Sequence, residues 1–245
     1  MLVNKNNCTG CAQCVPFCPC DAITINSEKK AVIDQDLCYE CGICLSVGSC
    51  KFDALYCQEL EGNRLIRYYY NNVLAKHPVT KMTGRGTAEM KTNELTDRFK
   101  RGEVGFGVEL GRPDVGASFR DVQTLAMALA KVGVRFEPGA PTTLLMEDPE
   151  IGKLQEDILE ERIICSIIEF SAPTTLLLQI IETLREVAKK IDTVFSVDMI
   201  TRAEEDGSLP NVEIVREMGI EVRPNGKATI GLGKPGEQVK AGETK

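Results

Sequence analysis

The apolar residues in the second half of the chain recur at two spacings, one typical of strands and one typical of helices. The largely apolar segment Glu103–Leu110 predicts a strand. A helix is expected to begin after Ser118, a good N-cap residue, and to end at Gly133. Residues 134–136 then predict a short strand. The positions that recur at helical spacing between the two helix ends are Phe119, Val122, Leu125, Ala126 and Leu129.

The same strand-helix-strand order appears a second time further along the chain. Residues 162–170 form an apolar run of strand length, and residues 194–199 predict another strand. Because two such units follow one another, we predict a split βαβ plait over residues 103–235, an open sheet with both helices on one face. A helix at 211–218, a strand at 220–223 and a segment at 227–232 would extend it. The helix of the second unit carries its apolar face at Leu177, Ile180, Ile181, Leu184, Ala188 and Ile191.

Residues 61–102 show neither spacing in a sustained form, so we interpret them as an extended basic connector or docking arm. At its start, residues 65–70 combine aromatic and β-branched side chains, which favours a strand or a contact arm. Residues 236–245 are rich in Gly, Lys and Glu and predict a flexible tail. The basic side chains of the connector are Arg64, Arg67, Lys76, Lys81, Arg85, Lys91, Arg98, Lys100 and Arg101.

The first 57 residues are interpreted as an internal duplication. Two groups of four cysteines are present, Cys8, Cys11, Cys14 and Cys18 followed by Cys38, Cys41, Cys44 and Cys50. The residues that follow also repeat, because 18–23 matches 50–55. Chance similarity of the cysteine spacing is therefore excluded in practice, and each half is expected to end in a short strand, at 22–25 and at 54–57.

Composition and charge narrow the possible functions. The net charge is -7, and the one basic stretch is residues 61–102, which argues against a general nucleic-acid binder and favours an acidic partner surface or an anionic ligand. The chain begins without an apolar signal core, and no stretch approaches the roughly 20 apolar residues of a membrane span. We therefore expect a cytoplasmic protein. In that compartment its 11 cysteines indicate a metal protein rather than disulfides.

Three closely spaced cysteines in one loop suit an iron-sulfur cluster, because such a loop presents three thiolates to three irons of one cube. With every ligand position filled, the first 60 residues resemble bacterial-type two-4Fe-4S ferredoxins. The resemblance implies that the last cysteine of each group serves the cluster of the other group. The implied ligands are Cys8, Cys11, Cys14 and Cys50 for the first cluster, and Cys38, Cys41, Cys44 and Cys18 for the second.

The predicted fold class is thus α+β, an N-terminal two-cluster ferredoxin domain (1–60) followed by the split-βαβ domain. Two departures from the ferredoxin pattern stand in the second repeat. Five residues separate Cys44 from Cys50, and Lys51 occupies the position of the usual proline. We expect the extra residues around Gly48 to bulge near the fourth ligand of the first cluster, which predicts unequal potentials for the two clusters.

Structural zinc is the alternative reading of these cysteines. Zinc sites generally pair C-x2-C knuckles rather than place three cysteines in one loop, so iron-sulfur clusters are the favoured reading. Three further thiols, Cys20, Cys57 and Cys165, are interpreted as small buried residues and receive no role.

Residues 76–87 are a candidate anion site. Lys81 and Arg85 lie between glycines and threonines, where cations and backbone N-H groups could hold a carboxylate or phosphate. A solvated basic loop explains the same residues and remains the alternative. His77, the single histidine, stands before a proline and is interpreted as a turn residue, since no partnered acid is evident.

A second resemblance covers residues 74–235. The segments LAKHPVTKMTGRGT (74–87), VGFGVELGRP (104–113) and RPNGK (223–227) are similar to the ferredoxin-bearing part of 6-hydroxynicotinate reductase and its relatives. The resemblance implies ferredoxin-linked reduction of an electron-poor ring or conjugated system, with flavin as partner cofactor. Since the chain is too short to include the flavin part, the resemblance implies a subunit that another polypeptide completes.

Three hypotheses follow from these patterns. The leading one is an electron-transfer subunit that takes electrons from a redox donor such as ferredoxin and passes them to a flavoprotein or other reductase subunit. The second is a self-contained reductase that grips an anionic substrate with Lys81, Arg85 and His77. The third is a non-enzymatic redox sensor whose plait binds a small ligand.

Overall fold

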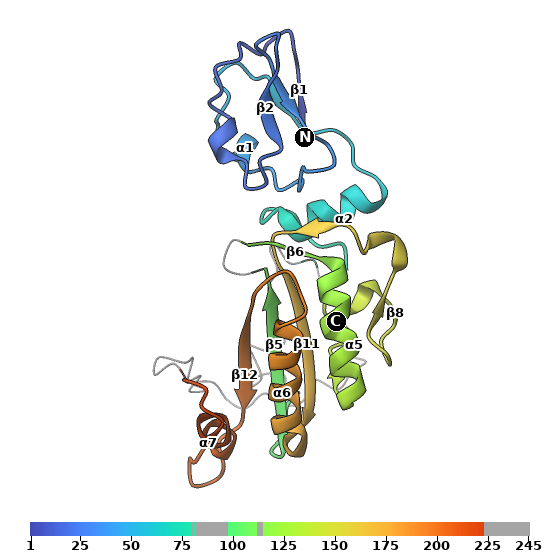
Figure 1. Ribbon diagram of the computed structural model, residues 1–245, viewed down its shortest axis with the longest axis vertical. Helices are drawn as coiled ribbons and strands as arrows, with labels where there is room; N and C mark the ends of the chain where they lie inside the picture. Colours follow the sequence, from blue (N-terminus) through green and yellow to red (C-terminus); the bar gives the residue numbers. More distant parts are fainter. Residues whose placement is uncertain (80, 82–97, 112–114, 223–245) are drawn as a thin grey trace, which may run out of the picture.

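The computed structural model describes residues 1–79, 81, 98–111 and 115–222. The chain forms two domains that lie one above the other along the long axis of the molecule, with helix α2 (Gly62–Asn71) between them (Figure 1). The upper domain holds the cysteine groups, and the lower domain is built on a sheet. In the described part of the chain, no helix is long and apolar enough to cross a membrane.

The N-terminal domain contains two small antiparallel ladders. Strand β1 (Leu2–Val3) pairs with β4 (Leu55–Tyr56), and β2 (Ile23–Ile25) pairs with β3 (Ala31–Ile33). The strands expected at 22–25 and 54–57 are therefore present. A 3-10 turn, Val15–Phe17, directly follows the third cysteine of the first group. At the corresponding place of the second repeat, a short helix α1, Ile43–Ser46, contains the third cysteine, Cys44.

Helix α2 corrects the strand predicted for residues 65–70, which are helical and serve as a contact segment. Ile66, Tyr69 and Tyr70 lie three and four positions apart and pack against the core of the lower domain. Aromatic and β-branched composition favoured a strand, and this contact overrides it. Of the remaining connector, residues 80 and 82–97 lie outside the described part.

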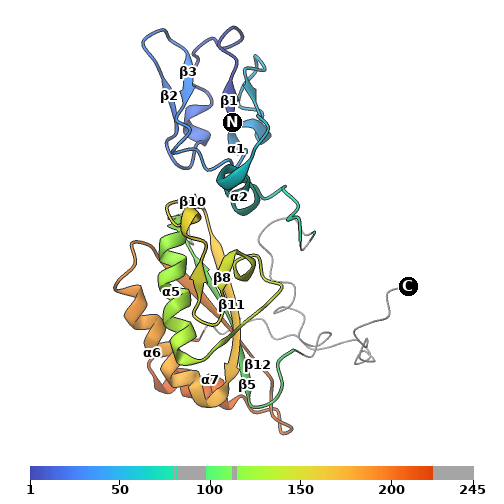
Figure 2. The same ribbon diagram turned by 90° about the vertical axis from the view of Figure 1, so that its right-hand side faces the viewer.

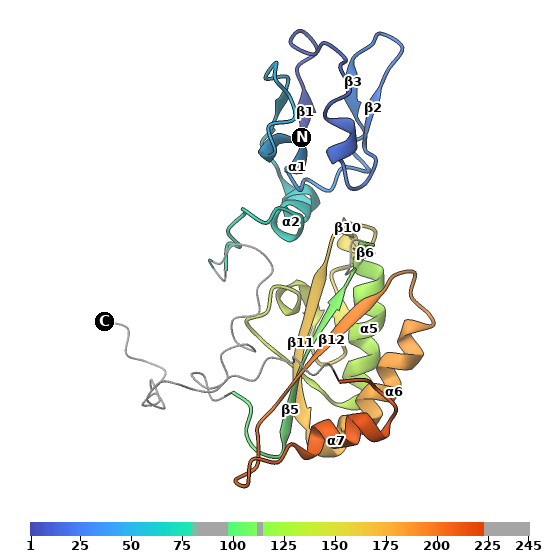
Figure 3. The ribbon, with the colours of Figure 1, turned by 90° about the vertical axis from the view of Figure 1, so that its left-hand side faces the viewer.

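The lower domain holds a four-stranded antiparallel sheet in the order β12-β5-β11-β7. Its strands are β5 (Glu103–Leu110), β7 (Arg135–Phe136), β11 (Ser166–Pro173) and β12 (Phe195–Thr201). Helix α5 (Phe119–Val132) joins β5 to β7, and helix α6 (Leu177–Ala188) joins β11 to β12. Both helices lie side by side on one face of the sheet (Figures 2 and 3).

Alternating residues of the central strands form the core between sheet and helices. Val104, Phe106, Val108 and Leu110 are fully buried, and the rings of Phe106 and Phe170 stack with their centroids 5.1 Å apart. Helix α5 begins and ends where predicted. The hydroxyl oxygen of Ser118 accepts from the Asp121 backbone N-H, and Gly133 ends the helix with a φ of 92°.

The run at 162–170, predicted as one strand, is divided in two. Strand β10 (Arg162–Ile163) pairs with β6 (Ala117–Ser118), and β11 begins only at Ser166. The chain leaves the ladder because the Ile164 backbone N-H donates to Asn71 Oδ1 of α2 at 2.6 Å. A hydrogen bond to helix α2 thus divides the segment that was predicted as one strand.

The other elements lie at the margins of the sheet domain. Helix α7 (Pro210–Glu217) confirms the helix expected at 211–218, whereas residues 220–222 form no strand, and residues 223–245 lie outside the described part. Sequence patterns did not indicate a β hairpin, β8 (Met146–Asp148) with β9 (Lys153–Leu154), or the 3-10 turns at Thr143–Leu145, Glu156–Ile158 and Thr174–Leu176.

Candidate metal centres

Two cavities in the N-terminal domain collect the cysteines of the duplication. The first has a volume of about 320 Å³ and is lined by Cys8, Cys11, Cys14 and Cys50. The second has a volume of about 300 Å³ and is lined by Cys18, Cys38, Cys41 and Cys44, together with Cys20. Each cavity therefore gathers three cysteines of one group and the last cysteine of the other, the combination that the ferredoxin resemblance implies.

Backbone hydrogen bonds between the two repeats produce this crossing. The Asn4 backbone N-H, which precedes the first group, donates to the Ala54 carbonyl oxygen at 2.7 Å. In the same way, the Asp34 N-H donates to the Ala22 carbonyl oxygen at 2.8 Å. The start of each cysteine loop is thus tied to the segment just after the last cysteine of the other group. Cys50 is thereby carried to the first cavity and Cys18 to the second.

The two loops also share their backbone conformation. Gly10 and Glu40 occupy equivalent positions, and both have left-handed backbone with φ of 70° and 54°. At Gly10 the residue type is dictated by space, since a Cβ there would lie 1.9 Å from the Lys29 carbonyl oxygen. At Glu40 the strained conformation is accepted because its carboxylate is held in place by other groups, described below.

Backbone N-H groups point at three cysteine sulfurs. The amides of Ala22 and Ala54 donate to Cys18 and Cys50 at 3.2 and 3.3 Å, in equivalent positions of the two repeats. The amide of Ala31 donates to the sulfur of Cys8 at 3.3 Å. Such donors stabilise a thiolate, the form in which cysteine binds metal.

Burial acts in the opposite direction on several of the thiols. It raises the pKa of Cys14, Cys38 and Cys41, and raises the pKa of Cys44 to about 11. In the exposed Cys11, a hydrogen bond from the Gln13 backbone lowers the pKa. A thiol must lose its proton to bind metal, so the raised pKa of these buried thiols weakens metal binding at neutral pH. Metal binding is also coupled to folding of the loops that carry the thiols.

Cys20, to which sequence reasoning assigned no role, lines the second cavity. Its sulfur lies 3.7 Å from that of Cys18, and this hydrogen bond lowers the pKa of Cys18 and raises that of Cys20. The equivalent position in the other repeat is Phe52, which lines the first cavity. The repeat of 18–23 in 50–55 already shows this difference in residue type, and the structure adds that both side chains line the cavities. Of the other spare thiols, Cys57 contacts Met1 and Cys165 is buried.

The irregular segment between Cys44 and Cys50 borders the first cavity. Helix α1 ends at Ser46, its C-cap residue Val47 is 51% exposed, and Gly48 turns the chain with a φ of 63°. Ser49 is buried, donates from its hydroxyl to the Cys44 carbonyl oxygen at 2.5 Å and lines the first cavity. The extra residues thus form an exposed turn beside the fourth cysteine of that cavity, where the sequence predicted a bulge.

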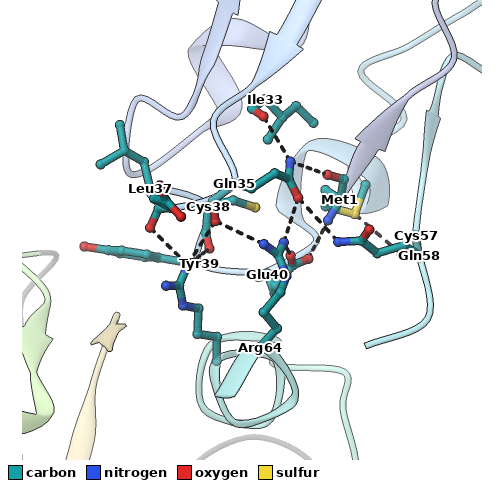
Figure 4. A network of polar contacts seen from close by, with 12 residues as sticks. Met1, Ile33, Gln35, Leu37, Cys38, Tyr39, Glu40, Cys57, Gln58 and Arg64 are labelled. Atoms are coloured by element: carbon teal, nitrogen blue, oxygen red, sulfur yellow. Dashed lines mark hydrogen bonds and ion pairs between the residues drawn. The ribbon is translucent and has the colours of Figure 1, made fainter. Parts of the chain in front are cut away.

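Helix α2 lies under the second cysteine loop and holds it with side chains. Arg64 Nη2 donates to the side-chain oxygen of Gln35 at 2.8 Å and also contacts the Glu40 carboxylate (Figure 4). Glu40 is 3% exposed, and its other oxygen lies 2.5 Å from the Met1 ammonium group. A buried carboxylate paired in this way with two cations fixes the loop between Cys38 and Cys41.

Arg67, one turn along α2, reaches the same loop. Its Nη1 donates to the carbonyl oxygens of Gln35, Asp36 and Cys38 at 3.1, 3.0 and 3.0 Å. Its Nε donates to the Glu161 carboxylate of the sheet domain. Arg67 therefore joins the second cysteine loop to the lower domain.

Asn71 makes a second bridge of the same kind. Its side-chain N-H groups donate to the carbonyl oxygens of Tyr39 at 2.8 Å and Arg162 at 3.3 Å, and its oxygen accepts from Ile164. A Cβ added to Gly116 would lie 3.3 Å from the Tyr39 hydroxyl, which places that ring against the sheet domain. Sequence reasoning missed this contact set, although Arg64, Arg67 and Asn71 recur at helical spacing.

The candidate anion site is described only in part. Lys81 is exposed, and its backbone N-H donates to the His77 carbonyl oxygen at 2.9 Å, while Arg85 lies outside the described residues. Partial burial lowers the pKa of His77. Anion binding by Lys81 and Arg85 stays a prediction.

Comparison with known proteins agrees with this geometry. The family model "4Fe-4S binding domain" matches residues 1–24. A ferredoxin of Methanothermococcus thermolithotrophicus is 34% identical over 61 residues, which make up 24% of this chain and 98% of that protein. The comparison with solved structures gave no match.

Proposed function

Because this chain belongs to the ferredoxin family through its N-terminal domain, we propose that it holds two 4Fe-4S clusters and transfers electrons within a reductase. The observation that carries the proposal is the pair of cavities, each lined by four cysteines of the duplicated pattern. When bound, such a cluster accepts and releases single electrons.

The residues present fit two clusters. Cys8, Cys11, Cys14 and Cys50 would hold the first, and Cys38, Cys41, Cys44 and Cys18 would hold the second. The support is threefold: the cysteines converge from two chain segments, backbone amides point at their sulfurs, and the loops share one conformation. Four thiolates are the ligand set of this cluster type.

We further propose that the lower domain is a split βαβ plait and that it carries the link to the reductase. The strand order β12-β5-β11-β7, with α5 and α6 on one face, supports the plait. The likeness of residues 74–235 to 6-hydroxynicotinate reductase supports a flavin-bearing partner subunit that acts on an electron-poor ring or conjugated substrate. The firm attachment of the second cysteine loop to this domain supports electron delivery in its direction.

The cluster proposal is tested by anaerobic purification followed by iron, sulfide and zinc analysis. About eight irons and eight sulfides per chain are expected from two four-iron clusters. The Cys57→Ala variant, which alters an exposed thiol outside both cavities, should keep the same content. Stoichiometric zinc without sulfide would refute the proposal.

The partner proposal needs a separate measurement. Purified under argon from its native source, the chain should elute with a flavin-containing polypeptide, detected by the flavin absorbance of the complex. Elution of the cluster-loaded chain by itself would contradict the subunit role and leave the clusters in place.

A further inference from the structure

The two cysteine loops each receive a cation on the carbonyl group of their first cysteine. Lys30 Nζ donates to the Cys8 carbonyl oxygen at 2.5 Å, and Arg67 Nη1 donates to the Cys38 carbonyl oxygen at 3.0 Å. Cys8 and Cys38 are equivalent in the duplication, so the two cations bind the same backbone position of the two loops. Their origins differ, because Lys30 belongs to the cluster domain and Arg67 belongs to helix α2.

Arg67 has a second partner that Lys30 lacks in the described residues. The same guanidinium that holds the Cys38 carbonyl also pairs with Glu161, just before strand β10. The two side chains are only 13% and 14% exposed, so solvent screens their charges weakly. Glu161 is itself fixed to the sheet domain, since its carbonyl oxygen accepts from the Phe119 backbone N-H at 3.1 Å, at the start of α5.

We propose that Arg67 is a positioning residue through which the sheet domain sets the reduction potential of the second cluster, and that the first cluster is insulated from that domain. The inference rests on the proposed pair of clusters. It assigns a regulatory part to the ion pair between Arg67 and Glu161, which joins the two domains.

The physical basis is the dependence of cluster potential on nearby charge and hydrogen bonds. A positive charge near the cysteine loop favours the reduced, more negative cluster and raises its potential. A carboxylate that shares the guanidinium offsets part of that charge. Any event in the sheet domain that draws Glu161 toward or away from Arg67, such as docking of a partner subunit, therefore changes the potential of the second cluster.

Neighbouring glutamates provide a matched experiment. Glu161→Gln removes the charge that faces Arg67, and Glu160→Gln removes the same charge one residue away, where Glu160 is 80% exposed and pairs with Arg120. The potentials of both clusters are measured in the full chain by redox titration followed by electron paramagnetic resonance. We expect Glu161→Gln to raise one of the two one-electron steps and leave the other in place, and Glu160→Gln to move neither appreciably.

Three further variants identify the route. Arg67→Gln should lower the step that Glu161→Gln raises, and Glu161→Gln should raise that step less when it is added to Arg67→Gln than when it is made alone. Lys30→Gln should lower the other step. Where Arg67→Gln fails to assemble, the comparison of Glu161→Gln with Glu160→Gln decides alone.

The outcomes separate this inference from the cluster proposal. A chain without iron and sulfide contradicts the proposed function itself. A chain with both clusters, in which Glu161→Gln and Glu160→Gln give equal potentials or in which Glu161→Gln moves both steps equally, overturns the part assigned to Arg67.

Discussion

The two cysteine loops follow one plan, but they are held in different ways. The first loop is fastened from within its own domain, by Lys30 on the Cys8 carbonyl and by the close approach of Lys29 to Gly10. The second is fastened from outside, by Arg64, Arg67 and Asn71 of helix α2. A duplicated unit has thus diverged where one copy meets a neighbour. Only the second loop is connected through α2 to the sheet domain in these contacts, so a change in that domain should affect the second loop more than the first.

The largest effect is expected from the cysteines that cross between the repeats. Cys18→Ala should abolish the second cluster and Cys50→Ala the first, each lowering iron to about half. In double variants, Cys18→Ala with Cys44→Ala should lose no more iron than either single change, because both side chains line one cavity. Cys18→Ala with Cys14→Ala should lose nearly all iron. The reverse pattern in anaerobic iron analysis would show that the ligands do not cross.

The next effect concerns the left-handed residue of the first loop. Gly10→Ala would place a Cβ 1.9 Å from the Lys29 carbonyl oxygen, so the loop must open, at a cost of about 2–4 kcal/mol. Gly48→Ala also has a positive φ but meets no atom within 4 Å, so about 1 kcal/mol is expected there. Denaturant unfolding of both variants measures the difference. Equal losses would mean that backbone conformation, and not space, selects glycine at position 10.

A smaller loss is expected when the bridge from the second loop is removed. Asn71→Ala leaves the Ile164 N-H and the Tyr39 carbonyl oxygen without their partner, at about 1–3 kcal/mol. Asn63 lies on the same helix as Asn71, and its side chain donates an exposed hydrogen bond to the Asp157 carbonyl oxygen. Asn63→Ala should therefore lower the stability by less than about 1 kcal/mol. Faster amide hydrogen exchange at Ile164 in Asn71→Ala alone would localise the loss. Unchanged exchange there would show that the bridge does not hold the two domains together.

The smallest effect is a pH dependence at the contact of α2 with the sheet domain. Complete burial raises the pKa of Tyr70 in the folded state, so the folded chain keeps this proton more tightly than the unfolded chain. The contribution to stability is fully present below the unfolded value of about 10 and is lost as pH rises above it. Tyr70→Phe should flatten the decline between pH 10 and 11, measured by thermal unfolding, and Tyr68→Phe should not.

Much of the architecture could be predicted because local patterns and the final fold agree. The helical spacing from Phe119 to Leu129 matches α5, and Ser118 and Gly133 mark its ends. The cysteine duplication predicted two groups of cysteines, and the resemblance to two-cluster ferredoxins implied the crossed combination that lines the two cavities. The corresponding short strands, β2 and β4, were also found in place.

Two of the failures occur where the two domains meet. Residues 65–70 have strand-like composition, yet they are helical. In the helix, Ile66, Tyr69 and Tyr70 share one face and pack against the core of the sheet domain. The run at 162–170 has the length and the mostly apolar composition of one strand, and its interruption at Ile164 depends on an asparagine 93 positions away. Local propensity carries no information about such a partner, because the hydrogen bond exists only after both segments have folded.

The sequence by itself determined that the N-terminal domain carries two repeated groups of cysteines, and its likeness to ferredoxins gave the combination in which they gather. It also determined most helices and strands of the sheet domain, through the spacing of apolar residues. Only the tertiary structure decided that the two loops are held differently, since the second loop contacts α2 and is joined through Arg67 to Glu161, 94 positions away. The physical reason is that buried charges and carbonyl groups are satisfied by whatever the fold brings within reach, and sequence spacing cannot reveal that partner.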